Sequence, residues 1–205
     1  AYPLCIAPRN QPQGGNRLLQ VGSPSNEGPT VPLDWLAGMT DGSLGYPLRQ
    51  SLRNQLRPRD IRRFVVTVVT QVLVNADDPA FKTPNKPIGP FLSEADARDR
   101  EKRLGWNIRE ERGRGWRRLV PSPRPIKVIQ RDMIRDAARA GHVVVACGGG
   151  GIPIVEKEDG QYSGIEAVID KDLTSSVLGI NIGAALLIIL TAVPNVYVHF
   201  GTPEQ

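Results

Sequence analysis

The chain has 205 residues, enough for one compact domain or two small ones with a hydrophobic core. Apolar residues make up 40% and charged residues 23%, a globular composition that excludes disorder along the whole chain. The formal net charge is +5, and residues 98–118, with nine cations and four acids, account for all of it. A uniformly basic nucleic-acid-binding surface is therefore excluded, whereas a local basic patch is not.

The cysteines and the apolar segments indicate the compartment in which the chain works. Its two cysteines, Cys5 and Cys147, are too few for a disulfide framework, and we predict buried free thiols in a reducing compartment. The first residues lack the basic lead and the cleavage site of a signal peptide. The longest apolar stretch, residues 177–193, is shorter than the ~20 residues of a membrane-spanning helix. These patterns predict a soluble, cytoplasmic protein without a membrane partner.

The order of the apolar segments predicts an α/β fold. Residues 64–74 are dense in β-branched side chains and do not alternate, which is typical of a strand buried on both faces of a parallel sheet. Strands are predicted at residues 2–7, 64–74, 142–147 and 186–190, and helices at residues 33–57 (most firmly at 48–56), 131–140 and 172–178. We therefore expect a three-layer αβα sandwich around a mainly parallel sheet with right-handed crossovers.

Residues 76–125 interrupt this alternation. They are rich in proline, glycine and charge, and about fifty residues are too many for a plain loop between sheet elements. Within them, Ser93 precedes acidic residues, which predicts the N-cap of a helix at residues 93–104. We interpret the segment as a small protruding lobe, suited to act as a lid, inserted in a single domain that spans residues 1–205.

Four consecutive glycines, Gly148, Gly149, Gly150 and Gly151, follow the predicted strand at residues 142–147. Glycines at such a place let the backbone approach a ligand and turn its amides toward an anion, above all where a helix begins nearby. A tight turn without a ligand is the alternative interpretation. No Gly-Lys-Ser or Gly-Lys-Thr follows, which excludes a Walker loop.

Two lysines lie in settings suited to a phosphoryl group or a substrate. Lys171 stands between Asp170 and Asp172 at a predicted strand-to-helix corner, where a neighbouring carboxylate can hold its ammonium in place. Lys86 lies in the proline-rich segment 81–91, and a stiff backbone loses little entropy when it positions a contact. A solvated turn and a proline-rich linker are the respective alternatives.

Other polar residues give weaker signals. His142 and His199 have no Cys, His or acidic partner at ligand spacing, so we predict no metal site built from protein ligands. Residues 113–123 combine arginine and tryptophan. They could stack on bases or bind phosphate, although such a run more often forms a basic hinge packed by its tryptophan.

Taken together, these segments resemble the carbamate kinases of the amino-acid kinase superfamily. The most specific parts of the resemblance are Lys-Pro-Ile-Gly-Pro-Phe at residues 86–91, Gly-Arg-Gly-Trp-Arg at residues 113–117 and the four glycines. Further matching segments are PLDWLAGMTDGSLGY (32–46), TQVLVNADDPAF (70–81), CGGGGIPIV (147–155) and IEAVIDKDLTS (165–175). The resemblance covers nearly the whole chain and implies an amino-acid kinase-like fold, with residues 76–125 as its protruding subdomain.

The resemblance implies reversible phosphoryl transfer between ATP and carbamate, giving ADP and carbamoyl phosphate in arginine metabolism. Mg²⁺ would bridge the phosphates, mostly through water and nucleotide oxygens. The implied partners are these small molecules and a second copy of the chain in a homodimer, with no nucleic acid. The implied roles place Lys171 on the transferring phosphoryl group, Asp172 as the residue that orients the lysines, Lys86 at the carbamate end, Asn10 and Gly148 to Gly151 along the phosphate and substrate, and Asp170, Thr191 and Tyr197 beside the nucleotide.

The sequence also departs from the family pattern. The family opens with a strand and a Gly-Gly-Asn loop ahead of the residue equivalent to Ala1, and it continues past Gln205. Its phosphate loop His-Gly-Asn-Gly-Pro-Gln is Pro-Arg-Asn-Gln-Pro-Gln at residues 8–13, and Ala192 replaces an aspartate.

Two alternatives therefore stay open. One is a catalytically inactive or truncated carbamate kinase fragment, whose unpaired sheet edge would favour self-association. The other is an Arg-rich nucleic-acid-binding module built on residues 98–118, whose binding to random DNA would weaken with added salt.

Overall fold

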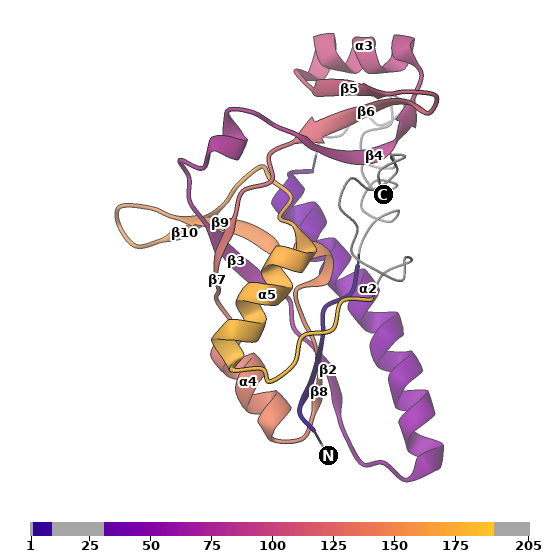
Figure 1. Cartoon of the computed structure of the whole chain (residues 1–205), viewed down its shortest axis with the longest axis vertical. Helices are drawn as coiled ribbons and strands as arrows, with labels where there is room; N and C mark the ends of the chain where they lie inside the picture. The colour runs from indigo at the N-terminus through magenta and orange to yellow at the C-terminus, as the bar shows by residue number, and fades with distance from the viewer. Residues whose placement is uncertain (1, 10–30, 191–205) are drawn as a thin grey trace, which may run out of the picture.

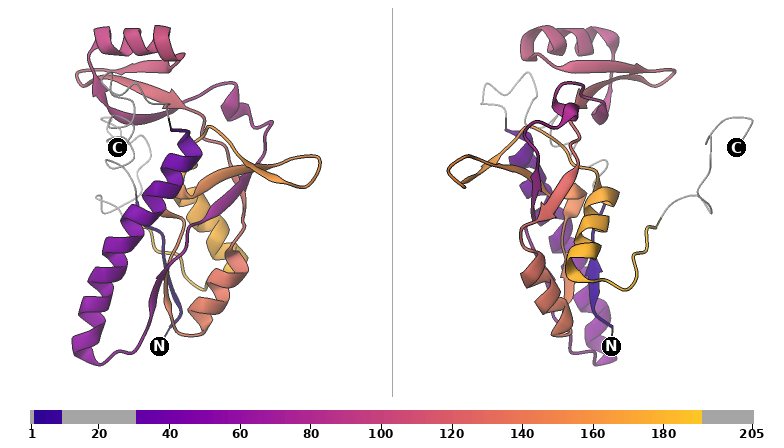
Figure 2. Two further views of the ribbon diagram at one scale, coloured as in Figure 1. Left: turned by 180° about the vertical axis from the view of Figure 1, so that it is seen from behind. Right: turned by 60° about the vertical axis from the view of Figure 1, so that its left-hand side comes forward.

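The computed structural model describes residues 2–9 and 31–190 and has an α/β architecture. A layer of strands lies between helix α2 (Leu33–Leu56) on one side and helices α4 (Arg131–Arg139) and α5 (Lys171–Ile182) on the other (Figures 1 and 2). The predicted αβα arrangement is confirmed.

The strand layer consists of two hydrogen-bonded groups. In the first, β1 (Leu4–Ile6), β8 (Val143–Val145) and β2 (Val65–Thr67) are parallel, in the order β1-β8-β2. In the second, β3 (Gln71–Val74) is parallel to β9 (Ile152–Glu156). Two outer strands, β7 (Pro125–Val128) and β10 (Tyr162–Gly164), join that pair antiparallel, in the order β10-β9-β3-β7. The central pairings are therefore parallel, as the sequence predicts.

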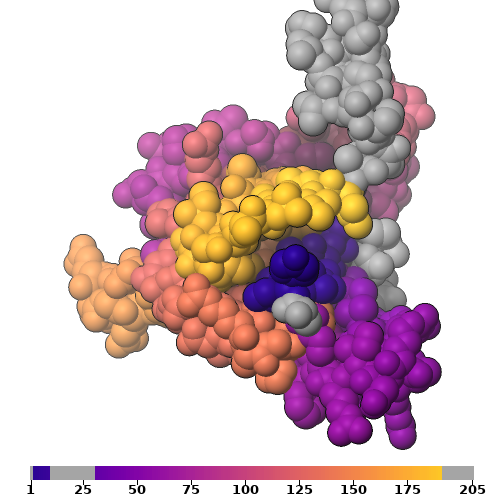
Figure 3. Space-filling view, turned by 60° about the horizontal axis from the view of Figure 1, so that its bottom comes forward, coloured from indigo at the N-terminus to yellow at the C-terminus, as the bar shows by residue number. Residues whose placement is uncertain are grey.

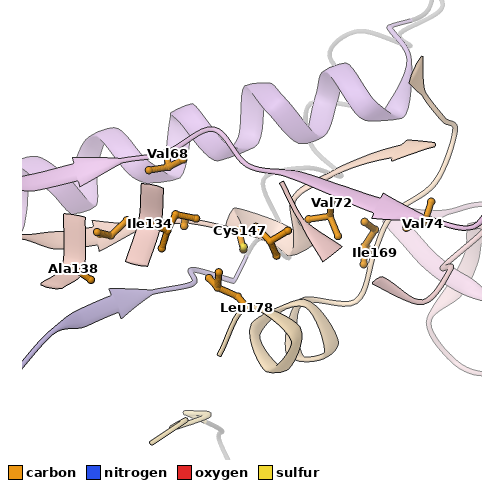
Figure 4. Packing of buried hydrophobic residues seen from close by; sticks show 11 residues of the cluster. Val68, Val72, Val74, Ile134, Ala138, Cys147, Ile169 and Leu178 are labelled. Carbon is orange, nitrogen blue, oxygen red and sulfur yellow. The ribbon is translucent and has the colours of Figure 1, made fainter. Parts of the chain in front are cut away.

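The largest hydrophobic cluster lies between the strands and the helices α4 and α5 (Figure 4). Its side chains come from the strands, from α4 and α5 and from the segments beside them, and fully burying one Val, Leu or Ile contributes about 1.5–3 kcal/mol. Members with no measurable exposure are Val72, Val128, Ile134, Val144, Cys147 and Ile169. The helical spacing of Ile134 and Ala138 on α4 turns both side chains inward. Helix α2 packs through two smaller clusters, one with Leu33 and Leu36 and one with Leu48, Leu52 and Leu56.

Helix α2 is continuous over its 24 residues, although the sequence favours its later part. Two of its three glycines face the strands: a Cβ on Gly38 would lie 3.2 Å from Cδ1 of Ile152, and one on Gly45 would collide with the side chain of Thr67. Each glycine costs the helix about 1 kcal/mol of propensity. The close packing of the helix on the strands offsets this cost. Helix propensity, which depends only on the local sequence, does not include the energy of that packing.

The predicted single strand at residues 64–74 is two strands that belong to different sheets. β2 pairs with β8, whereas β3 pairs with β9 and β7. The chain bends at Thr70, whose hydroxyl donates to the carbonyl of Val68 at 2.8 Å and whose amide donates to the Asp41 carboxylate at 2.9 Å. The β-branched run continues through this bend, so the hydrophobic pattern does not reveal it.

Residues 186–190, predicted to be a central strand, form none. α5 ends at Ile182, Gly183 adopts a left-handed conformation (φ +67°), and the five apolar side chains that follow at 186–190 are 46–89% exposed. A strand needs a neighbour for its backbone groups, and this segment pairs with no strand among the described residues. The hydrophobic composition of residues 186–190 predicted a strand, but composition alone does not supply the neighbouring strand with which it would have to pair. None of the described helices combines the length and the apolar character that a membrane crossing requires.

A third sheet stands apart at one end of the molecule (Figure 1). It contains β4 (Lys86–Leu92), β6 (Gly115–Val120) and β5 (Asn107–Glu111), antiparallel and in that order, with α3 (Glu94–Leu104) packed on it. Ser93 caps α3 as predicted, since its hydroxyl accepts the amide of Asp96 at 3.1 Å. Short 3-10 turns at Arg57–Arg59, Pro79–Phe81 and Gly148–Gly150 complete the elements.

Candidate functional site at the glycine loop

The glycine run lies where the ends of two parallel strands meet the start of α5. It follows β8 and forms the 3-10 turn η3 (Gly148–Gly150). The amide of Gly149 donates to the carbonyl of Pro8, just after β1, at 3.0 Å. The hydroxyl of Thr174 in α5 donates to the carbonyl of Gly150 at 2.9 Å. Carboxyl ends of parallel strands beside a helix start are where open α/β sheets bind ligands.

Glycine is required in this loop because its backbone approaches two neighbours closely. Gly150 has a φ of +109°, and a Cβ there would collide with the carbonyl oxygen of Ile169, next to α5. A Cβ on Gly148 would collide with Oδ1 of Asp41 on α2. The loop is therefore held between the two helix layers, and only residues without a side chain fit there.

The loop amides all donate within the protein. Gly148 donates to Asp41, Gly149 to Pro8, Gly150 to the carbonyl of Cys147 at 3.1 Å, and Gly151 to the carbonyl of Gly148 at 3.3 Å. The sequence predicts that these amides turn toward an anion, whereas the structure gives each of them a protein acceptor. In this conformation a ligand can approach the loop backbone closely, but the positive charge that an anion requires has to come from neighbouring side chains.

Lys86 reaches this site from the third sheet. Its Nζ donates to the carbonyl of Ile169 at 3.0 Å and lies 3.4 Å from Oδ2 of Asp170, the N-cap residue of α5. The Lys86 side chain is 23% exposed. Because Ile169 is also the residue against which Gly150 packs, Lys86 and the glycine loop meet at the same turn.

Lys171 is the first residue of α5, and its ammonium lies 2.7 Å from Oδ1 of Asp172. The backbone amide of Lys171 would be 3.5 Å from a Cβ on Gly150, so the start of α5 lies directly against the glycine loop. The structure thus brings together the glycine loop, both predicted lysines and the two predicted carboxylates, Asp170 and Asp172.

In the ion pair between Lys86 and Asp170, the pKa values of both partners are lowered, for different reasons. Burial works to raise the pKa of Asp170, but the charge of Lys86 and hydrogen bonds from the amides of Leu173 and Asp172 outweigh it, and the pKa falls below its ordinary value. Burial lowers the pKa of Lys86, and Asp170 and Asp172 offset this only in part. The partly desolvated ammonium would therefore gain from a further anion at the site.

Asp41 is a carboxylate that sequence reasoning missed. It is 3% exposed beneath the glycine loop and accepts the amides of Thr70 and Gly148. Burial raises its pKa to about 6, against the lowering effect of these two hydrogen bonds. The available signal was the polar pair Thr40 and Asp41 at helical spacing from Leu33 and Leu36, inside the segment 32–46 that carries part of the family resemblance.

The thiols and His142 do not form a second reactive centre. Both cysteines are free. Burial raises the pKa of Cys5 to about 11 and also raises that of Cys147, so neither thiol is an effective nucleophile near neutral pH. His142 packs edge-on against Phe64, with ring centroids 5.4 Å apart. Within residues 2–9 and 31–190, no three His, Cys, Asp or Glu side chains gather as a metal site would require.

The arginines of residues 98–118 are largely used inside the third sheet. Arg98 lies 4.6 Å over the ring of Trp116, and Arg118 lies 4.8 Å over that of Trp106. Arg117 donates to two carbonyl groups of β4 and pairs with an acid of β5 at 3.3 Å. These contacts favour the basic hinge packed by tryptophan over a surface that stacks on bases.

Three residues predicted for the site, Asn10, Thr191 and Tyr197, lie outside the described residues. Their roles stay predictions, as do the catalytic roles given to Lys86, Lys171 and Asp172.

Comparison with known proteins gives the sequence context of this geometry. Residues 42–204 match the amino acid kinase family. The chain is 43% identical to the carbamate kinase of Pyrococcus horikoshii, covering all of this chain and 65% of that protein. It is 49% identical to the carbamate kinase of Lentilactobacillus hilgardii, covering 98% of this chain and 64% of that protein. The chain therefore spans slightly less than two thirds of these curated relatives.

Solved structures share the fold. A crystal structure from Aeropyrum pernix K1 superimposes with a TM-score of 0.92 at 39% identity, covering all of this chain and 66% of that chain. Carbamate kinase from Giardia lamblia bound to AMP-PNP superimposes with a TM-score of 0.78 at 37% identity, covering 89% of this chain and 58% of that chain.

Proposed function

Because the chain belongs to the amino acid kinase family, we propose that it acts as a carbamate kinase-like phosphotransferase. The reaction moves a phosphoryl group reversibly between ATP and carbamate and gives ADP and carbamoyl phosphate. Support comes from the relatives named carbamate kinase and from the Giardia enzyme solved with AMP-PNP. The observation that carries the proposal is the convergence of Lys86, on β4, and Lys171, at the start of α5, at the turn beside the glycine loop, although the two residues are distant in the sequence.

Phosphoryl transfer requires positive charge directed at oxygens whose negative charge shifts during the reaction. Lys171 suits this role because it stands at the amino-terminal end of α5, where the helix dipole also favours an anion. Its contact with Asp172 holds the ammonium at the start of α5, whose backbone lies against the glycine loop. We assign Lys171 to the transferring phosphoryl group and Asp172 to the orientation of the lysines, with Gly148 to Gly151 lining the phosphate and substrate.

Lys86 is assigned to the carbamate end of the reaction. It belongs to β4, so a ligand bound by its ammonium would tie the third sheet to the start of α5, and that sheet would act as a lid. Water excluded by such a lid would strengthen the electrostatic contacts inside. Asp170 is assigned to the nucleotide side, together with Thr191 and Tyr197.

The carboxylates at the site, Asp170 and Asp172, already pair with lysines. This donor set fits a Mg²⁺ ion held mostly by phosphate oxygens and water, with little direct protein ligation. When bound, the ion would neutralise charge on the phosphates.

The proposal also covers the compartment, the assembly and the metabolic role of the protein. Two free cysteines fit a reducing compartment, and we extend the proposal to a cytoplasmic homodimer that works in arginine metabolism. Sedimentation analysis tests the dimer, since a monomer at all concentrations would contradict it.

The test of the activity mixes the chain with ADP, Mg²⁺ and carbamoyl phosphate and measures ATP. Parallel samples contain Lys171→Ala and the matched control Lys157→Ala, which removes an exposed lysine after β9. We expect ATP from the parent and the control, and a loss of at least about 100-fold in Lys171→Ala, the usual effect of removing a preorganised donor. No ATP from the parent would contradict the activity, and equal turnover in Lys171→Ala would contradict the role of Lys171.

A further inference from the structure

The buried carboxylate of Asp41 has no part in the phosphoryl transfer proposed above, yet it joins three parts of the site. It comes from α2 and accepts the amide of Thr70, at the bend between β2 and β3, at 2.9 Å. It also accepts the amide of Gly148 at the start of the glycine loop. The hydroxyl of Thr70 in turn accepts the amide of Cys147 at 2.9 Å. Asp41 and Thr70 therefore hold the two residues that begin the loop.

The space around Asp41 leaves this arrangement little freedom. Gly148 has no room for a Cβ because Oδ1 of Asp41 lies against it. Asp41 is 3% exposed and Thr70 has no measurable exposure. Water therefore cannot readily take the place of the Thr70 or Gly148 amide as a hydrogen-bond donor to the Asp41 carboxylate. The position of the loop consequently depends on the hydrogen-bonding state of one carboxylate.

We propose that Asp41 is a positioning residue for the glycine loop: its ionised carboxylate holds the loop against α2, and its protonation releases one of the two amide tethers. An ionised carboxylate only accepts hydrogen bonds, whereas a protonated one carries an O–H donor that cannot bond to a facing N–H. The effect of Asp41 on catalysis rests on the proposed function, because the loop that it positions lies beside the start of α5, where Lys171 is assigned to the phosphoryl group.

The protonation falls in an accessible range because burial raises the pKa of Asp41 to about 6. Among the described residues, Cys147 is the titratable group that faces Asp41 from the loop, and it stays a neutral thiol because its own pKa is raised. Strands β2 and β8 and the turn η3 bring only valine, threonine and glycine. The charged residues on the other elements packed against α2 are exposed: Glu156 on β9 and Arg57 and Arg59 in the turn after the helix.

The first test follows the backbone amides of Gly148 and Thr70 by ¹H–¹⁵N NMR of the full chain from pH 5 to pH 8. We expect both signals to shift with one midpoint near pH 6, as Asp41 titrates. In Asp41→Asn the shift disappears, and hydrogen exchange of the Gly148 amide becomes about fivefold faster, the effect of losing one hydrogen bond. The matched control Asp60→Asn removes an exposed carboxylate and leaves the titration as in the parent.

These outcomes separate the inference from the proposed function. If the Gly148 amide of the parent does not titrate between pH 5 and pH 8, the inference is overturned whether or not the chain makes ATP. That measurement needs no variant, so it decides even if Asp41→Asn does not fold. If the amide titrates and no ATP forms, the phosphotransferase activity alone fails.

A second test uses the reaction. A loosened loop should bind its ligand less well while leaving Lys171 in place, so Asp41→Asn should raise KM for carbamoyl phosphate several-fold with a smaller effect on kcat. The increase of KM toward acid pH in the parent should flatten in the variant. An unchanged KM and an unchanged pH profile in a folded Asp41→Asn protein would overturn the positioning role.

Discussion

The ammonium of Lys86 on β4 lies 3.4 Å from Oδ2 of Asp170, the residue that caps α5. The other carboxylate oxygen of Asp170, Oδ1, accepts the amides of Asp172 at 2.9 Å and Leu173 at 3.3 Å. One side chain thus begins the helix with one oxygen and connects it to the third sheet with the other. Substitution of Asp170 can remove the ion pair alone or both contacts together.

Substitutions at Asp170 should therefore show a cap effect larger than the ion-pair effect. Asp170→Asn keeps a capping oxygen and loses the charge, and because the Asp170 side chain is 46% exposed we expect a loss below about 1 kcal/mol. Asp170→Ala loses the cap as well and should cost about 1 kcal/mol more. Urea unfolding of both variants measures the difference, and equal stabilities would show that the side chain does not cap α5.

The stability of the protein should carry a pH-dependent contribution from Asp41. Burial raises its pKa from 3.8 to about 6, so the neutral form is favoured in the folded state. The resulting stability is present below about pH 4 and is lost as pH rises through about 6, a change of about 3 kcal/mol.

Asp41→Asn removes this titration. The free energy of unfolding of the parent minus that of the variant should therefore fall by about 3 kcal/mol between pH 4 and pH 7. Asp170 and Asp78 have lowered pKa values and contribute with the opposite sign, but both proteins contain them, so their contributions cancel. A difference that does not vary with pH would show that the pKa of Asp41 is ordinary.

Two glycines with similar backbones should respond differently to alanine. Gly150 and Gly160 both have positive φ angles, +109° and +79°, but only Gly150 packs against a neighbour, the carbonyl oxygen of Ile169. Gly160→Ala should cost about 1 kcal/mol from backbone strain alone. Gly150→Ala adds a backbone collision and should cost about 3 kcal/mol or more. Thermal unfolding compares the two, and similar losses would indicate that the loop is not tightly packed.

The exposed apolar segment at residues 186–190 should promote self-association. The side chains of this segment are exposed to solvent. Strand β1, at the edge of the sheet β1-β8-β2, also lies open to the surface beside α5 (Figure 3). Open strand edges and contiguous apolar patches favour contacts between molecules. Ile188→Lys should reduce concentration-dependent association in sedimentation experiments.

Met133→Lys is the matched control for that substitution. Met133 is 48% exposed, but it stands on helix α4, away from a run of exposed apolar residues. It should leave the association unchanged. An equal effect of both substitutions would point to net charge as the cause.

The α/β class and the residue types of the site followed from the sequence. Runs of β-branched residues, the helix pattern at residues 131–140, the cap at Ser93 and the acid–lysine–acid corner around Lys171 are local signals, and local sequence carries them. The family resemblance then joined Lys86 and Lys171 in one site, and the structure places both at the same turn.

Features that depend on distant partners were decided only by the tertiary structure. At the bend between β2 and β3, the amide of Thr70 donates to Asp41, which lies on another element. Residues 186–190 have the composition of a strand and lack a neighbour among the described residues. The loop amides from Gly148 to Gly151 bond to protein acceptors supplied in part by α2 and the end of β1. Hydrophobicity and propensity are properties of a segment, whereas a hydrogen bond or a strand pairing belongs to two segments, and only the folded chain determines which two meet.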